Sequence, residues 1–338
     1  MKNRSQRTTE AAVPAATSVA VTTPTQSPFA AWIDDWRRGW EAFWFTPSQP
    51  HTLALIRILG GAMIFYTHLV WTKEYSNFLG AQPWVDTATS KLLNTDAGGT
   101  LYGFSHFWWI DSPGALWGIH LFALLCMAAL TLGLYTRAAA IFTCFFTLSY
   151  CHRLAGCQFG LDQVNAMFAL YLMIGRPGDV WSLDRWLAKR RAGGELPPPQ
   201  SSVGNTIAIR LLQLHLCVIY LFGGIGKMRG ESWWDGSALW LAFASGEYQS
   251  WDMTWMGRYP WLLAALTHGT VFWETFYPLI VWPRLTRPIA LAMAVMVHAG
   301  IAISMGMVTF GTAMIIANLA FVTAAESRWC VERLTGRR

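Results

Sequence analysis

Eight apolar runs separated by polar segments constrain the fold of this sequence more than any other feature. A helix needs about 20 mostly apolar residues to cross the roughly 30 Å hydrocarbon layer of a bilayer. We therefore predict an all-α, polytopic transmembrane helix bundle of about eight spans. The third and fourth runs are short, so they form tilted spans, a buried pair or a re-entrant hairpin at CHRLAGCQFG. The runs cover approximately residues 52–71, 115–135, 138–152, 161–175, 206–225, 261–282, 288–303 and 308–325.

The low charge content argues against a soluble protein. Only 13% of the 338 residues are charged, whereas a typical soluble chain carries about 25%. The formal net charge is +6, but the basic residues lie in tails and loops between the apolar runs. No basic face is left to follow a nucleic-acid backbone, so we predict the lipid bilayer, and not nucleic acid, as the partner.

The distribution of Lys and Arg predicts the orientation of the chain. Cytoplasmic loops of membrane proteins carry an excess of basic residues. With the N-terminus inside, most of the 25 Lys and Arg residues fall in cytoplasmic segments. Arg57 and Arg210 lie within runs, near their cytoplasmic ends, where they can snorkel. We therefore predict a multi-pass protein of the cell membrane with both termini in the cytoplasm. The basic residues on the external side are Lys73, Lys91, Arg153, Lys227, Arg229 and Arg258.

Three segments flank the predicted transmembrane domain, which covers residues 51–325. Residues 1–28 are rich in Ala, Thr, Ser and Pro and predict a disordered N-terminal tail. Residues 29–50 form an amphipathic segment that either lies in the headgroup layer or packs against the bundle. Residues 326–338 predict a basic cytoplasmic tail. The tryptophans that recur at i+4 spacing in the amphipathic segment are Trp32, Trp36, Trp40 and Trp44.

Three segments between the runs are distinctive. A Pro-, Gly- and Ser-rich stretch around 190–205 predicts a linker between two halves of the bundle. The predicted external segments 72–113 and 226–260 are long and rich in Trp, Tyr and Phe. Aromatic belts at the interface explain part of this enrichment. Loops of this size on one side of a bundle are also where a site would be covered.

The cysteines predict neither a disulfide framework nor a metal site. Cys126, Cys144 and Cys217 fall inside apolar runs, as expected of small buried side chains. Cys151 and Cys157 either form a disulfide, if their loop faces an oxidising compartment, or stay free. The Cys and His spacing matches no zinc motif, so we predict no bound metal.

Polar residues in or next to the runs favour the outer half of the membrane. Ionisable groups at this depth are unfavourable, so each calls for a partner or a function. If the bundle brings these side chains together, they form a polar pocket open to the exterior. Three of these residues also have a structural interpretation: Asp162 as a helix cap, His298 as a buried histidine with its hydrogen bonds satisfied, and Glu274 as the partner of an arginine. The set comprises His68, Asp162, Asn165, Lys227, Glu274 and His298.

Lys227 is the strongest candidate for chemistry. It lies in YLFGGIGKMRGESWWDGSALW, at a Gly-rich helix end that precedes the pair Trp233 and Trp234. A lysine removed from water gives up its proton more readily and can act as a general base. Alternatively, Lys227 only interacts favourably with the helix dipole at a C-terminus. The stretch is not a phosphate-binding loop, because Leu221 and Met228 occupy positions where that motif needs Gly and Ser or Thr.

Three motifs resemble the HTTM domain, the membrane domain shared by vitamin K-dependent gamma-carboxylases and many bacterial proteins. They are CQFGLDQVNAMFALYLMIGRPGDVWSLDRWL, GKMRGESWWDGSALW and MVHAGIAISMGMVTFGTAMIIANLAF, and the likeness covers roughly residues 45–325. The resemblance implies binding of a reduced naphthoquinone of the vitamin K type as cofactor, with epoxidation chemistry. It also implies that Lys227 is the base and that His298 matches a family histidine. A second catalytic histidine of the carboxylase has no counterpart, since Leu161 and Asp162 occupy the nearest positions.

Two functional hypotheses follow. In the first, the protein is a quinone-dependent oxidase or carboxylase-like enzyme. The catalytic residues are then Lys227, His298 and Asp162, and the ligand-binding residues are His68, Asn165, Trp233, Trp234 and Glu274. The sequence lacks a match to the large lumenal domain that holds the carboxylase's protein substrate, so quinone binding is favoured over protein carboxylation. In the second, the protein is non-enzymatic, giving immunity to a secreted toxin or assisting a secreted peptide or protein partner. A solute transporter is disfavoured because the sequence shows no inverted repeat.

Overall fold

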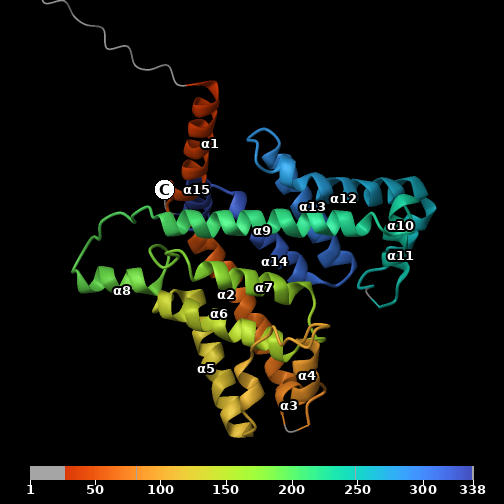
Figure 1. Ribbon diagram of the computed structural model, residues 1–338, viewed down its shortest axis with the longest axis horizontal. Coiled ribbons are helices and arrows are strands. Elements are labelled where there is room, and N and C mark those ends of the chain that lie inside the picture. The colour runs from red at the N-terminus through yellow and green to blue at the C-terminus, as the bar shows by residue number, and fades with distance from the viewer. Residues whose placement is uncertain (1–26, 81, 248, 337–338) are drawn as a thin grey trace, which may run out of the picture. The chain divides into compact units, whose positions relative to one another are not determined.

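The computed structural model describes residues 27–80, 82–247 and 249–336, and its regular elements are helices (Figure 1). The all-α prediction is confirmed for this part of the chain. The predicted disordered tail falls almost wholly on residues 1–26, outside the described residues. The α-helices are α1 (Pro28–Phe45), α2 (His51–Trp71), α3 (Tyr75–Leu79), α4 (Thr87–Leu93), α5 (Pro113–Leu132), α6 (Thr136–Arg153), α7 (Gly160–Leu172), α8 (Leu183–Arg191), α9 (Val203–Lys227), α10 (Glu231–Trp234), α11 (Ala238–Ala244), α12 (Pro260–Ile280), α13 (Arg287–Ser304), α14 (Val308–Asn318) and α15 (Ala324–Leu334).

The chain divides into two units, Met1–Ala42 and Phe43–Arg338. In the first unit, the described residues are largely helical, as the i+4 tryptophan spacing predicts. The Trp36 and Trp40 rings stack with centroids 5.6 Å apart. Both side chains are at least half exposed. This helix therefore presents a row of indole rings at its surface.

Each of the eight apolar runs corresponds to a helix of the second unit, but only some of these helices are long and apolar enough to cross a membrane. Among the described residues, four segments satisfy both conditions: His51–Leu79, Pro113–Leu132, Val203–Lys227 and Arg287–Ser304. The last apolar helix, Val308–Phe321, is shorter. The structure therefore supports a multi-pass membrane protein and does not confirm the count of eight spans.

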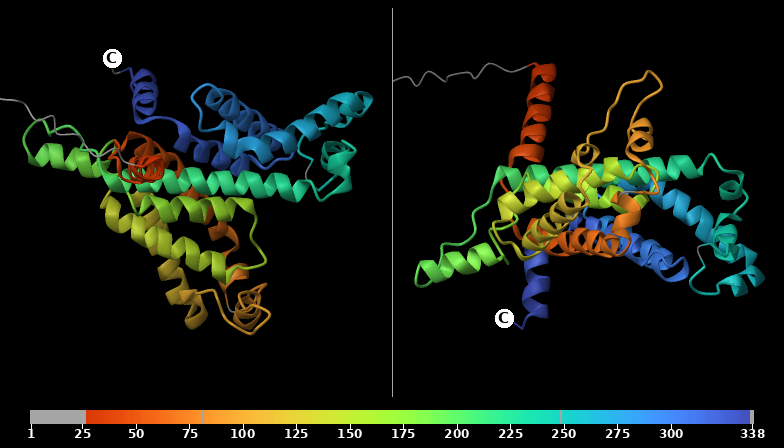
Figure 2. Two further views of the ribbon diagram at one scale, coloured as in Figure 1. Left: turned by 45° about the horizontal axis from the view of Figure 1, so that its top comes forward. Right: turned by 90° about the horizontal axis from the view of Figure 1, so that it is seen from below.

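Helix α9 lies between α12 and α7 in the second unit. It packs extensively along α12 and also contacts α7, and Figures 1 and 2 show it between them. Its first turn is capped by Ser202, whose hydroxyl accepts a hydrogen bond from the Asn205 amide at 3.1 Å. Helices α2, α5, α6, α7 and α14 complete the core, where Leu53, Met127 and Phe168 are fully buried.

The contact between α9 and α12 depends on Gly224. A Cβ atom at this position would lie 2.7 Å from the Thr275 amide nitrogen and would also clash with the Thr275 hydroxyl. We expect Gly224→Ala to lower the free energy of unfolding by about 1–3 kcal/mol, because overpacking forces two helices apart. Thermal unfolding in detergent measures this effect. Gly226→Ala is the matched control, since a Cβ there meets nothing within 4 Å; an equal loss in both variants would contradict the role of close packing.

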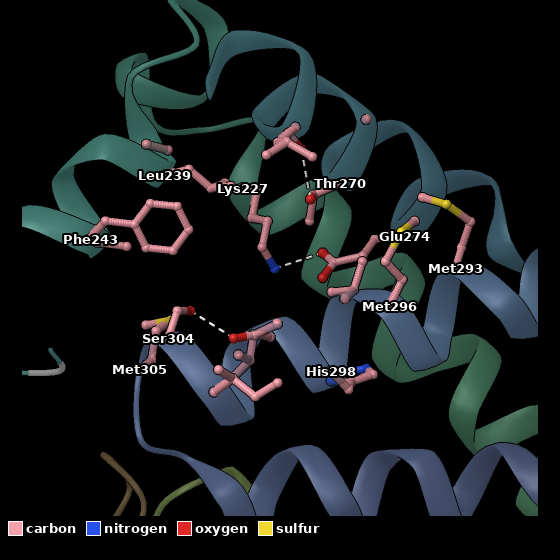
Figure 3. A pocket seen from close by; sticks show the side chains of 18 of the residues that line it. Lys227, Leu239, Phe243, Thr270, Glu274, Met293, Met296, His298, Ser304 and Met305 are labelled. Atoms are coloured by element: carbon pink, nitrogen blue, oxygen red, sulfur yellow. Dashed lines mark hydrogen bonds and ion pairs between the residues drawn. The ribbon is translucent and has the colours of Figure 1, made fainter. Parts of the chain in front are cut away.

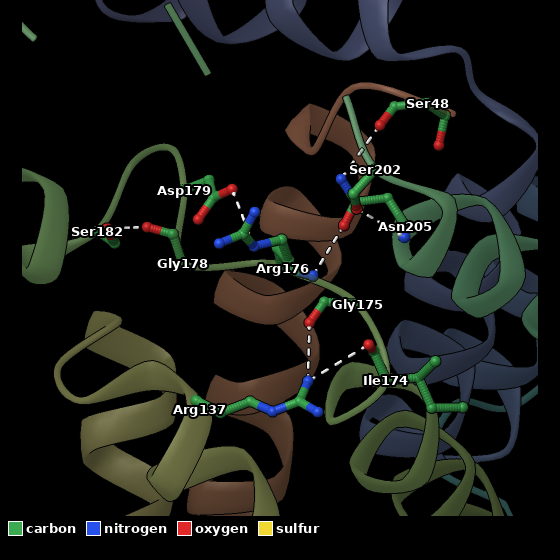
Figure 4. A network of polar contacts seen from close by, with 10 residues as sticks. All are labelled: Ser48, Arg137, Ile174, Gly175, Arg176, Gly178, Asp179, Ser182, Ser202 and Asn205. Carbon is green, nitrogen blue, oxygen red and sulfur yellow. Dashed lines mark hydrogen bonds and ion pairs between the residues drawn. The ribbon is translucent and has the colours of Figure 1, made fainter. Parts of the chain in front are cut away.

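Arginines occupy the C-terminal ends of three helices. Arg57 donates to the Leu130 and Thr131 carbonyls at the end of α5, and Arg287 donates to those of Val281 and Trp282 after α12. Arg137 donates to the carbonyls of residues 173–175 after α7. Figure 4 shows its contacts with Ile174 and Gly175. Cationic side chains at these ends satisfy carbonyls that have no partner in the helix and complement its dipole.

The two long aromatic-rich segments are folded rather than extended. Segment 72–113 contains α3, α4 and the 3₁₀ helices η1 (Thr72–Glu74) and η2 (His106–Trp109). In it, the buried Trp108 donates from Nε1 to the Ser90 hydroxyl at 2.9 Å. Segment 226–260 contains α10, α11 and η3 (Thr254–Arg258). Cys151 and Cys157 are both free, so the disulfide alternative is not realised in this structure.

Candidate functional site

A cavity of about 720 Å³ lies among α9, α11, α12, α13 and α14 (Figure 3). Its size falls within the usual range for small-molecule sites, about 300–1,000 Å³. Most of its lining is apolar, and the polar side chains within it include Lys227, Glu274, His298 and Tyr220. Many of the apolar lining residues are methionines: Met253, Met256, Met293, Met296, Met305 and Met314.

The central polar feature of the cavity is the ion pair between Lys227 and Glu274. Lys227 Nζ lies 2.6 Å from Glu274 Oε2, and the side chains are 28% and 10% exposed, respectively. The sequence predicted an arginine as the alternative partner of Glu274, and the partner is instead this lysine. A Cβ at Gly223, one turn before Lys227, would lie 3.4 Å from Glu274 Oε2, an ordinary van der Waals distance, so the pair lies directly against this turn of α9. The ammonium group also lies 5.5 Å from the centre of the Trp233 ring.

A hydrogen-bonded chain of buried side chains runs from α12 to His298. The Tyr277 hydroxyl donates to Asn318 Oδ1 at 2.6 Å, and Asn318 Nδ2 donates to the Tyr220 hydroxyl at 2.8 Å. The Tyr220 oxygen in turn lies 2.9 Å from His298 Nε2. The four residues come from four different helices, α12, α14, α9 and α13. This chain therefore holds together the helices that surround the cavity.

The structure brings together only part of the predicted site. Lys227, Glu274, His298 and Trp233 line the cavity. Trp234 does not line it. Its side chain is 64% exposed and donates to the Met228 carbonyl at 2.6 Å.

The remaining predicted residues lie in the half of the core formed by α2, α6 and α7. His68 is buried, with Nδ1 2.8 Å from the Ile64 carbonyl and its ring beside those of Trp71 and Tyr150. Asn165 donates to the Thr67 hydroxyl at 3.1 Å. Asp162 accepts a hydrogen bond from the Phe159 amide at 3.0 Å, as a residue of the first turn of α7 does. The structure does not place these three side chains in the cavity.

Several site residues were missed because they are uncharged or distant in sequence. Tyr220 shares a helix face with Gly223 and Lys227, so the spacing could have indicated it. Tyr277 follows Glu274 at i+3, which carries the same signal. Asn318 gives no such signal from the sequence. A second missed contact joins His120 Nδ1 to the Tyr150 hydroxyl at 2.6 Å, in the other half of the core.

A smaller cavity of about 480 Å³ lies between the start of α12 and the segment that contains α10, α11 and η3. Asp235 and Arg258 line it. Hydrogen bonds from the side chain and backbone of Ser237 hold the pKa of Asp235 below its usual value. This carboxylate is therefore ionised at neutral pH, and it accepts hydrogen bonds within its own turn.

The lining of the larger cavity is mostly apolar with a few polar side chains. Among the described residues, no group of three or more His, Cys, Asp or Glu side chains could hold a metal ion. The larger cavity combines apolar walls with a few polar groups, which is the arrangement that binds amphipathic small molecules.

Comparisons with known proteins support one family. The family model described as HTTM domain matches residues 45–325. No curated protein and no solved structure matches the chain.

Proposed function

The chain belongs to the HTTM domain family, and from this premise we propose that its larger cavity binds a reduced, lipid-borne naphthoquinone and that Lys227 accepts a proton from it. The observation that carries the proposal is the placement of Lys227, Glu274 and His298 on the wall of one largely apolar cavity. A reduced naphthoquinone bound there would supply a hydroxyl group that can be deprotonated, and dissolved molecular oxygen would be the oxidant and the source of the epoxide oxygen.

Glu274 gives Lys227 a route to its basic form. An ammonium group cannot accept a proton, so Lys227 must first lose one. Glu274 Oε2 lies 2.6 Å away and can take it, which leaves a neutral amine beside a neutral acid. Lys227 Nζ then accepts the proton of the ligand, and the restored ammonium faces the negative charge left behind.

Other residues complete the proposal. His298 offers a hydrogen bond to a ligand oxygen, and Trp233 covers the ammonium side of the cavity. His68, Asp162 and Asn165 remain proposed proton-relay or binding residues through the α2 and α7 half of the core. Trp234 remains a proposed ligand contact at the surface. We further propose that eight helices span the cell membrane with both termini in the cytoplasm, as the basic residues indicate.

The ion pair also supports a second candidate function. Because Lys227 and Glu274 satisfy each other without a ligand, the cavity can be a purely structural feature. The protein would then act through a secreted peptide or protein partner, as an immunity or accessory protein. In that case Lys227 would stabilise the bundle and take no part in turnover.

Substitution of Lys227 separates the two functions. Purified protein is supplied with reduced menaquinone, and epoxide formation is followed. We expect turnover in the wild type and a loss of at least about 100-fold in Lys227→Met, because a positioned base contributes about that much. Lys227→Arg is expected to be equally inactive, since a guanidinium stays protonated.

Lys73→Met serves as the control, because it removes an exposed lysine outside the cavity. Unchanged turnover in Lys227→Met would contradict the proposed base. Absence of turnover in the wild type would favour the partner function.

A further inference from the structure

In the hydrogen-bonded chain that ends at His298, the donor and the acceptor of each bond follow from the chemistry of the residues. We propose that Tyr277, Asn318 and Tyr220 are positioning residues that hold His298 in the tautomer with its proton on Nδ1, so that the imidazole serves the cavity as a hydrogen-bond donor.

Only one orientation of the Asn318 amide is compatible with its neighbours. One end of this amide lies 2.9 Å from the Met314 carbonyl oxygen, which can only accept a hydrogen bond. The amide nitrogen must therefore face Met314, because an oxygen there would repel the carbonyl. This places Oδ1 toward Tyr277, whose hydroxyl must donate to it.

In the hydrogen bond between Asn318 and Tyr220, the amide is the donor. The amide nitrogen has two protons and no lone pair to accept with. One proton goes to the Met314 carbonyl and the other to the Tyr220 oxygen. Tyr220 is therefore the acceptor in this bond, and its own hydroxyl proton remains available for a different neighbour.

The Tyr220 hydroxyl determines which nitrogen of the His298 ring carries the proton. The available proton of Tyr220 points to His298 Nε2, which lies 2.9 Å from the tyrosine oxygen. Nε2 must then be the unprotonated nitrogen, and in a neutral imidazole the proton lies on Nδ1. The opposite tautomer would leave the Tyr220 proton without an acceptor in the core. All four side chains are at most 4% exposed, so bulk water cannot replace a missing partner.

In this tautomer, the Nδ1–H group of His298 is a donor without a partner. His298 Nδ1 is buried and has no hydrogen-bond partner among the described residues, while the side chain lines the larger cavity. A buried N–H group without a partner is unfavourable. We infer that the ligand class of this cavity carries an acceptor oxygen for Nδ1. This role rests on the proposed function, whereas the tautomer itself does not.

Nitrogen NMR of the histidine rings tests the tautomer directly. The full-length protein is labelled with ¹⁵N-histidine and purified in detergent, and the His298 signals are assigned by their loss in His298→Gln. We expect Nδ1 to carry the proton and Nε2 to be unprotonated. We also expect Tyr220→Phe to shift His298 toward the Nε2-protonated form, because the phenyl ring offers no proton to Nε2.

Tyr171→Phe is a matched control, since it removes a hydroxyl that lies 3.0 Å from Nδ1 of another histidine, His215. This variant should leave the His298 signals unchanged. A wild-type His298 with its proton on Nε2 would overturn the proposal, as would an unchanged tautomer in Tyr220→Phe. If Tyr220→Phe does not fold, the wild-type spectrum alone decides.

Reduced menaquinone, added to the same samples, separates this inference from the proposed function. A shift of the protonated Nδ1 signal on addition would support the donor role. With the expected tautomer but no shift, the tautomer stands and the donor role toward this ligand is refuted.

Discussion

Replacement of Arg57 by leucine is expected to cause the largest loss of stability of any single substitution considered. Arg57 is fully buried, and its guanidinium donates to four backbone carbonyls. Nη1 reaches Leu130 and Thr131 at 2.9 and 2.6 Å, Nε reaches Pro177 at 3.1 Å, and Nη2 reaches Trp181 at 2.6 Å. This one side chain thus joins α2, the end of α5 and the segment before α8.

The size of the effect follows from the carbonyls left without partners. A hydrogen bond from a charged donor contributes about 1.5–3 kcal/mol, and a buried acceptor without a partner is unfavourable. We expect Arg57→Leu to lower the free energy of unfolding by at least about 4 kcal/mol, a value that only a few mechanisms reach. Thermal unfolding in detergent, monitored by size-exclusion chromatography, measures the change in stability.

Two further variants make the Arg57 prediction specific. Arg57→Lys keeps the charge but lacks the planar fork, so it should recover only part of the stability. Arg229→Leu removes an exposed arginine and should change stability by no more than about 0.5 kcal/mol. Full stability in Arg57→Lys would show that charge, and not the set of four hydrogen bonds, is what matters.

The second large effect is expected at the Lys227–Glu274 pair. Lys227→Met should leave the Glu274 carboxylate buried without its partner. A fully buried pair broken in this way costs about 3–5 kcal/mol. Because Lys227 is 28% exposed, we expect a smaller loss of about 1–3 kcal/mol. The double variant Lys227→Met with Glu274→Gln should recover most of the loss, since no charge then stays unpaired.

A double-mutant cycle measures the coupling between the two side chains. The exposed pair Arg328–Glu332, at 2.7 Å, is the matched control and should give only about 0.3–0.5 kcal/mol. Equal coupling in both pairs would contradict the view that the cavity pair is held in an apolar environment. This cycle needs no ligand, so it stands apart from any result on turnover.

Much of the fold follows from the sequence because membrane helices are defined by local composition. Each apolar run became a helix, and the structure confirms the all-α class for the described residues. The helix ends were less predictable. The run 161–175 predicts a longer helix than α7, which ends at Leu172. Arg137 binds the carbonyls that follow, and this contact comes from a different helix.

The polar residues of the candidate site could be chosen from the sequence, but the direction of each side chain could not. The sequence predicts His68 and Lys227 near the outer ends of their apolar runs. Which neighbour each side chain faces depends on how the helices pack, and the apolar runs do not show it. His68 faces Tyr150 and Trp71, whereas Lys227 faces Glu274. One predicted pocket therefore became two separate groups of polar residues.

The methionines of the cavity wall have a consequence for which molecules it can accept. Thioether side chains are unbranched and polarizable, so they adapt to an irregular shape with little penalty. A wall that contains Met293, Met296 and Met305 can adjust to hydrophobic tails of different length or saturation. For the proposed ligand, selectivity would then reside in its polar head group. The same wall is open to oxidative damage, because conversion to sulfoxides would make it hydrophilic and reduce its affinity for such tails.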